Sequence, residues 1–120
     1  MHSPLEKKFN EYVGNIHSIL HSDVIFLNEP AFVNQLLDKM EFLKRNFVIM
    51  NSITDDVYVY QDRLSVIATH SRQTLEWVYL INVPSLQGAS TFSSLKENLF
   101  MLNDLFETSQ NLIKSFYPVA

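Results

Sequence analysis

Residues 57–81 of this chain read VYVYQDRLSVIATHSRQTLEWVYLI. Val, Ile and Tyr are frequent in this stretch, which also contains Trp77, and these residue types prefer strands. At the helical spacing of about 100° per residue, however, the polar and apolar side chains separate onto two arcs. Strand alternation is broken at Ile67 and throughout residues 57–60, so we predict a helix. The polar arc comprises Gln61, Asp62, Ser65, Thr69, Arg72, Gln73 and Glu76, and the apolar arc comprises Val57, Tyr60, Leu64, Ile67, Ala68, Leu75 and Val78.

Two amphipathic helices are predicted before this stretch. The first covers about residues 4–21, with Ser3 as its N-cap and a proline in its first turn. The second follows an N-cap at Asn28 and covers about residues 30–45. Both are predicted because apolar side chains recur at steps of three and four residues along them.

Short polar segments mark the start of the helix in the middle of the chain. Thr54 is predicted to be its N-cap, and Asp55 and Asp56 are predicted to lie in its first turn. Carboxylates at that place interact favourably with the helix dipole. This explains the acidic pair without a catalytic role.

A last helix is predicted from about Ser90 to the residue before Pro118, because apolar residues repeat every three and four positions there. The chain has only 2 Gly and 4 Pro, which is too few for many tight turns. We therefore predict an all-α fold, an antiparallel four-helix bundle that forms a single domain over residues 1–120.

The strand-forming composition of the middle region leaves one alternative open, an α+β fold with a small antiparallel sheet formed by residues 46–83. With that sheet, the chain resembles the small acidic chaperones of type III secretion systems in size, charge and α-β-α order. Residues 75–84, followed by an amphipathic last helix, carry this resemblance. It implies a dimer that holds an extended segment of a client protein.

Composition narrows the classes of function. Of the 120 residues, 47% are apolar and only 18% are charged, which favours a packed core over a disordered chain. The formal net charge of −4 offers no basic field to a nucleic-acid backbone, so we expect no DNA partner. There is no cysteine and no apolar run of about 20 residues. We expect a cytoplasmic protein that does not contact membranes and holds no cofactor.

Two pairs of residues invite a chemical interpretation. His17 and His21 are four residues apart, a spacing that lets two imidazoles on adjacent helical turns share a metal ion. No third ligand is evident in the sequence, so we predict no metal and keep this pair as an alternative. Arg63 and His70 are separated by six residues and fall two turns apart on one helix face.

The spacing of Arg63 and His70 resembles the R-x4–6-H motif of the HEPN family of all-helical ribonucleases. The resemblance implies that the two residues act on RNA at a dimer interface. Leu64 stands where that family usually has a polar residue. We therefore predict no catalytic residue, and keep ribonuclease activity on RNA as the alternative function.

Several large apolar residues fall outside the main stripes of the predicted helices. An apolar patch that one bundle does not bury usually marks an interface. We predict a small helical protein-interaction module, an adaptor, chaperone or regulator, that holds a protein partner on an apolar helix face and forms a homodimer. A binding protein is favoured over an enzyme. The predicted partner-binding residues are Phe42, Ile49, Val59, Val66, Trp77 and Met101.

Overall fold

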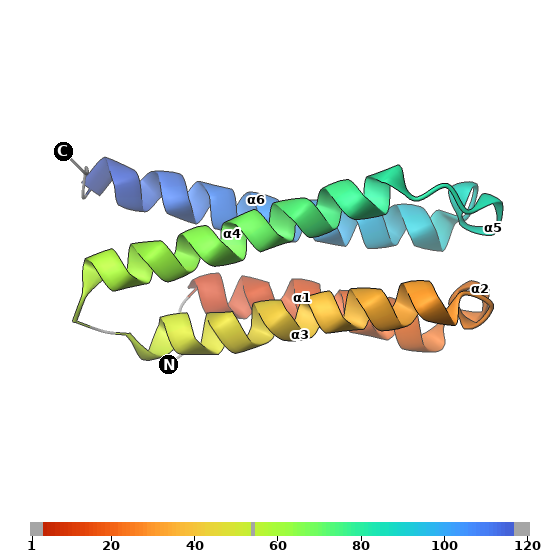
Figure 1. Cartoon of the computed structure of the whole chain (residues 1–120), viewed down its shortest axis with the longest axis horizontal. Coiled ribbons are helices and arrows are strands. Elements are labelled where there is room, and N and C mark those ends of the chain that lie inside the picture. The colour runs from red at the N-terminus through yellow and green to blue at the C-terminus, as the bar shows by residue number, and fades with distance from the viewer. Residues whose placement is uncertain (1–3, 54, 117–120) are drawn as a thin grey trace.

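The structure, a computed structural model, describes residues 4–53 and 55–116. Within those two ranges the chain is almost entirely helical and contains no strand, so the all-α prediction is confirmed. Its helices are α1 (Pro4–Ser22), α2 (Val24–Leu27), α3 (Pro30–Ser52), α4 (Val57–Leu80), α5 (Pro84–Gln87) and α6 (Ser90–Phe116) (Figure 1).

The alternative with a sheet in residues 46–83 is wrong, because α4 occupies most of that range. The two arcs of the sequence explain the outcome: burying one side of a helix satisfies both the apolar residues and the backbone hydrogen bonds. The buried residues of α4 recur at steps of three and four positions, with Ile67 and Ala68 adjacent on the same side of the helix. They are Leu64, Ile67, Ala68, Ser71, Thr74 and Val78.

The four long helices run along the longest axis of a molecule that measures 48 × 29 × 20 Å (Figure 1). Helix α4 packs on both α3 and α6, and α6 also packs on α1. The short helices α2 and α5 lie at one end, and the α3–α4 connection lies at the other (Figure 1). None of the helices in the described part of the chain combines the length and hydropathy of a membrane crossing.

Helices α4 and α6 approach closely because α4 presents small side chains to α6. Ala68, Ser71 and Thr74 are buried on α4. Within this interface the hydroxyl of Ser71 donates to Oδ1 of the buried Asn103 on α6, with 3.1 Å between the two oxygens. This bond satisfies polar atoms that would otherwise be costly to bury.

Aromatic rings fill the wider space between the other helices. Phe9 of α1 stacks on Phe47 of α3, with ring centroids 3.8 Å apart, and Phe106 of α6 lies against both rings. Phe32 of α3 contacts Phe92 of α6 edge to face at 6.1 Å. Burying such large rings contributes much of the hydrophobic free energy of a core.

Two helix boundaries differ from the sequence prediction. Helix α3 continues to Ser52, well past Arg45, because Phe47 and Met50 extend its buried stripe. Its N-cap is Glu29, one residue after the predicted Asn28, and makes no side-chain capping bond.

Both connections at the α2 and α5 end contain a single helical turn and have the same backbone pattern. Glu29 N donates to Phe26 O at 3.1 Å, and Ala89 N donates to Leu86 O at 3.1 Å. In each turn the central apolar residue, Phe26 or Leu86, is buried. Each connection is therefore held to the core by a buried side chain, and Ile25 in the first and Val83 in the second also pack against the core.

Asp56 is the N-cap of α4, and it was predicted to lie in the first turn. Its carboxylate accepts from the backbone N–H groups of Tyr58 at 3.0 Å and Val59 at 3.2 Å. The predicted cap Thr54 lies outside the described residues, as do Ser3 and Pro118.

We expect Asp56→Ala to lower the free energy of unfolding by about 1 kcal/mol, because two N–H groups lose their acceptor. Urea denaturation measures the loss. Asp56→Asn keeps an acceptor at the cap and should stay near wild type. Asp55→Ala, at the adjacent exposed residue, should change stability by less than about 0.5 kcal/mol. Equal losses in all three variants would contradict the assignment of the cap.

Candidate functional site

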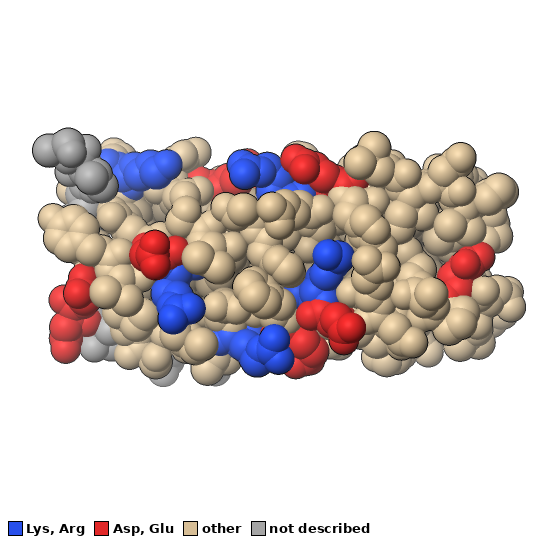
Figure 2. Space-filling model, viewed as in Figure 1, with Lys and Arg blue, Asp and Glu red and all other residues tan. Residues whose placement is uncertain are grey.

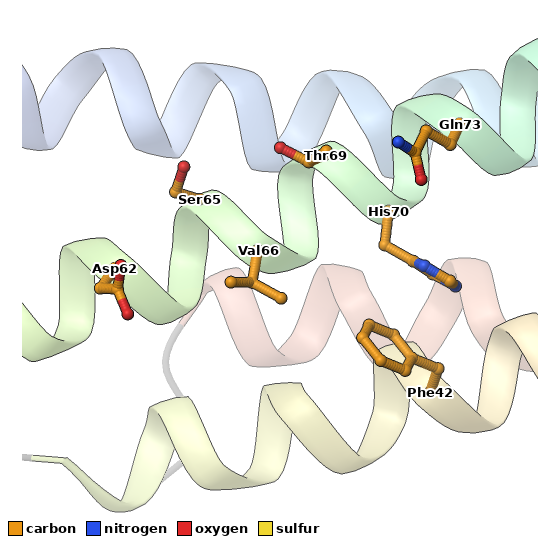
Figure 3. A pocket seen from close by; sticks show the side chains of 7 residues that line it. All are labelled: Phe42, Asp62, Ser65, Val66, Thr69, His70 and Gln73. Carbon is orange, nitrogen blue, oxygen red and sulfur yellow. The ribbon is translucent and has the colours of Figure 1, made fainter.

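A groove of about 310 Å³ lies between α3 and α4. Phe42 enters it from α3, and the remaining lining residues come from one side of α4 (Figure 3). Phe42 and Val66 supply apolar surface, and the polar residues of α4 stand along the groove. The lining consists of Phe42, Asp62, Ser65, Val66, Thr69, His70 and Gln73.

His70 is held at the groove by its contact with α3. Its ring lies against Phe42, with centroids 4.0 Å apart and the planes at 32° (Figure 3). Nε2 is buried and has no hydrogen-bond partner among the described residues. Burial lowers the pKa of His70 below its ordinary value of 6.5, and the charge of Lys39 adds to this effect. A backbone hydrogen bond with Lys39 acts in the opposite direction.

Arg63 lies two turns before His70 on α4, as the spacing predicts, but its guanidinium is engaged with α3. Nη1 of Arg63 donates to Oδ1 of Asn46 across a distance of 3.4 Å. Asn46 is itself buried, and its amide also donates to the carbonyl of Phe42 at 2.9 Å. Arg63 and His70 therefore both hold α4 against α3 in this single chain. Their pairing across a dimer remains a prediction.

The predicted partner-binding residues fall in four places. Phe42 and Val66 line the groove together. Ile49 and Val59 are exposed nearer the α3–α4 connection. Trp77 is half-buried, stacking on Phe32 with centroids 5.3 Å apart, while Nζ of Lys39 lies 5.4 Å from its ring centroid.

Met101 is the sixth predicted residue. It is exposed on α6, which packs on α1 and α4. It does not belong to the lining of the α3–α4 groove. The structure thus brings Phe42 and Val66 together and leaves Met101 apart from them.

His17 and His21 lie on successive turns of α1, with ring centroids 6.2 Å apart. Nε2 of His17 is buried and has no hydrogen-bond partner within the described ranges. Burial lowers the pKa of His17, Lys44 and His21 lower it further, and Glu41 opposes them. In the described part of the chain no three His, Cys, Asp or Glu side chains gather as metal ligands would. The pair therefore supplies two imidazoles, of which one faces α3.

Sequence reasoning missed the polar residues of the groove. Asp62, Ser65, Thr69 and Gln73 were assigned to the solvated arc of the helix, and they do belong to it. Only the position of α3 places Phe42 beside them and creates a hollow. The signal that the sequence offered for this groove was Val66, an apolar residue next to the polar arc.

Leu27 and Leu80 are not among the predicted partner-binding residues. Both are strongly exposed at the α2 and α5 end. A signal for them exists in the sequence, since no charged residue occurs between Glu76 and Lys96.

Comparison of the chain with protein-family models, with curated proteins and with solved structures gives no match. Function is therefore argued from the geometry of this chain alone.

We expect the free energy of unfolding to fall on acidification because His17 and His70 are buried as neutral rings. Their folded pKa values lie below 6.5, so the unfolded chain binds protons first as the pH falls. The stability present above about pH 6.5 is then lost progressively until the folded pKa values are passed. Urea denaturation at about pH 8 and about pH 5 measures the difference.

His17→Gln and His70→Gln should each reduce this pH dependence. His21→Gln is the matched control, because His21 lies on the same helix as His17 and is exposed. It should reduce the dependence only slightly, because His21 is one of the smaller causes of the lowered pKa of His17. If the two buried-histidine variants behaved like His21→Gln, the burial of these rings would not explain the acid sensitivity.

Proposed function

We propose that this chain is a protein-interaction module, an antiparallel four-helix bundle that holds a helix of a protein partner in the groove between α3 and α4. The observation that supports this proposal is the presence of two large apolar side chains, Phe42 and Val66, in the lining of the groove. Val66 has 40% of its surface exposed, and Ile49 and Val59 on the same two helices have 41% and 43% exposed. Large apolar side chains that gather at an exposed groove are typical of an interface.

The shape and chemistry of the groove suit an amphipathic helix. An apolar partner stripe would cover Phe42 and Val66, as in other helix-in-groove complexes. Asp62, Thr69 and Gln73 are exposed along the same groove and supply hydrogen-bonding groups at its edge. Such polar groups fix the register of a bound helix, and the apolar contact provides most of the free energy.

The charge of the chain favours a protein as the partner. With a formal net charge of −4, the molecule repels a phosphate backbone. The module is proposed to act in the cytoplasm as an adaptor, chaperone or regulator, and to form a homodimer. No observation favours the ribonuclease alternative, since Nε2 of His70 is buried and Arg63 donates to Asn46.

Photo-crosslinking tests the groove. Val66 replaced by the photoreactive residue p-benzoylphenylalanine should form an adduct with the partner in living cells, because this side chain is exposed in the groove. The same replacement at Leu112, exposed on α6, is the matched control and should not form that adduct. Mass spectrometry then identifies the partner, which is purified for binding measurements.

With the two purified proteins, we expect Val66→Asp to weaken binding by about tenfold or more, because a carboxylate would be buried against apolar surface. Leu112→Asp should bind as the wild type does. Circular dichroism should show the same helix content in both variants. Normal binding by Val66→Asp, or an equal loss in Leu112→Asp, would remove the groove as the binding site.

A further inference from the structure

The end of the molecule formed by α2, α5 and the adjoining ends of the long helices has almost no charge. We define the α2–α5 end as residues 23–37 and 77–95, in which Asp23 and Glu29 are the only Asp, Glu, Lys or Arg. Asp23 is the N-cap of α2, and its carboxylate accepts from the N–H of Ile25. Figure 2 shows that on the visible face the basic residues and nearly all the acidic ones lie over the middle and the opposite end. The α2–α5 end therefore differs in character from the rest of the surface.

The charge of Glu29 is used within the chain. Its carboxylate Oε1 accepts from the hydroxyl of Ser85, with 3.0 Å between the two oxygens. This bond joins the start of α3 to α5 and fixes the two connections beside each other. Both connections are also anchored by buried side chains, Phe26 and Leu86. The α2–α5 end is thus a defined surface.

Large apolar side chains project from this surface into solvent. Leu80 has 82% of its surface exposed, Val24 72% and Leu27 69%. These three residues contribute little to the core of the single chain. Their exposure at one uncharged end indicates a surface that another molecule covers.

A hollow at the same end is large enough to admit one such side chain. It has a volume of about 260 Å³ and lies beside Leu27, between the end of α1, α2 and the start of α3. Apolar side chains make up most of its walls. They are Leu20, Phe26, Leu27, Pro30, Val33 and Leu37, with His21 and Asn34 at the polar positions.

We propose that the α2–α5 end is the surface through which two copies of this chain form the homodimer. The inference rests on the dimer of the proposed function and names its interface. In a two-fold dimer each contact is made twice, so Leu80 of each copy enters the hollow beside Leu27 of the other. The hollow and the projecting side chain lie on different helical hairpins of one chain, which permits this exchange.

The distribution of charge favours the α2–α5 end as the surface where two copies of this chain meet. Each chain carries a formal net charge of −4, so contact through the charged middle of the molecule opposes like charges. At the α2–α5 end only Asp23 and Glu29 are charged, and their carboxylates already accept hydrogen bonds from the N–H of Ile25 and the hydroxyl of Ser85. Two identical acidic molecules therefore meet with least repulsion at this end. The groove between α3 and α4 stays open in such a dimer.

The solution mass tests the interface. Sedimentation equilibrium of the wild-type chain should give twice its 14.0 kDa mass. Leu80→Asp and Leu27→Asp should give 14.0 kDa at the same concentration, with unchanged circular dichroism because both side chains are exposed. Phe116→Asp, an exposed residue of α6 outside the α2–α5 end, is the matched control and should keep the doubled mass. A wild-type mass of 14.0 kDa, or a doubled mass in Leu80→Asp, would overturn the inference.

Cross-linking tests the predicted contact directly, because the chain has no cysteine of its own. Leu27→Cys and Leu80→Cys chains, mixed and mildly oxidised, should give a disulfide-linked dimer with one chain of each kind. Leu27→Cys mixed with Phe116→Cys should not. Failure of the first mixture to cross-link would overturn the proposed packing.

Two further results separate this inference from the proposed function. Val66→Asp should lose the protein partner and remain a dimer, because the groove and the α2–α5 end are different surfaces. If Val66→Asp were monomeric and Leu80→Asp dimeric, the homodimer would use the groove, and the inference would fail. If the wild type were monomeric and bound phosphatidylcholine vesicles through Leu27 and Leu80, the end would be a lipid surface, which also overturns it.

Discussion

The close packing of α4 on α6 sets the geometry of the rest of the molecule. Small buried residues on α4, Ala68, Ser71 and Thr74, allow α6 to approach along most of its length. A bond between Ser71 and Asn103 satisfies the polar atoms of this interface. Close packing of this kind gains dispersion energy that larger side chains would forfeit by holding the helices apart.

Large side chains fill the interface between the other pair of helices, α1 and α3. Helix α1 buries Phe9, Val13, Ile16 and Leu20 at the corresponding three- and four-residue steps. Helices α1 and α3 approach closely at few positions, and aromatic rings occupy the space between them. His17 is placed along this wider interface, beside Lys44 and Glu41. Partly buried histidine rings therefore lie at both of these interfaces of α3, His17 beside α1 and α3 and His70 against Phe42 between α3 and α4.

Helix α4 has neighbours on two sides, and its remaining surface has consequences for function. One side of α4 packs on α6, and another side packs on α3. The solvent-facing side of α4 that adjoins α3 lines the groove. The apolar surface that the core leaves uncovered is divided between the groove and the α2–α5 end. If the proposed homodimer uses that end, each copy still presents a groove, so that one dimer offers two binding sites. This arrangement would let the protein bring two partners together.

The sequence by itself determined the helical class and most of the buried residues, because three- and four-residue spacing fixes which side of a helix is apolar. It predicted residues 4–21 as a helix almost to the observed bounds, and it resolved 57–81 correctly against strand propensity. It identified Phe42 and Val66 as apolar residues outside the main stripes, and the structure places both at the groove. Periodicity carries this information because it is local.

Tertiary structure alone decided which surfaces meet. Helix α4 packs on both α3 and α6, and a single sequence does not show which neighbours a helix has. Asp62 and Thr69 belong to a groove only because α3 lies beside them. Leu27 and Leu80, 53 positions apart in the sequence, share one uncharged end because both connections fold to the same side of the molecule. Contacts between distant residues depend on how the helices pack, and that packing depends on side-chain volumes across every interface together.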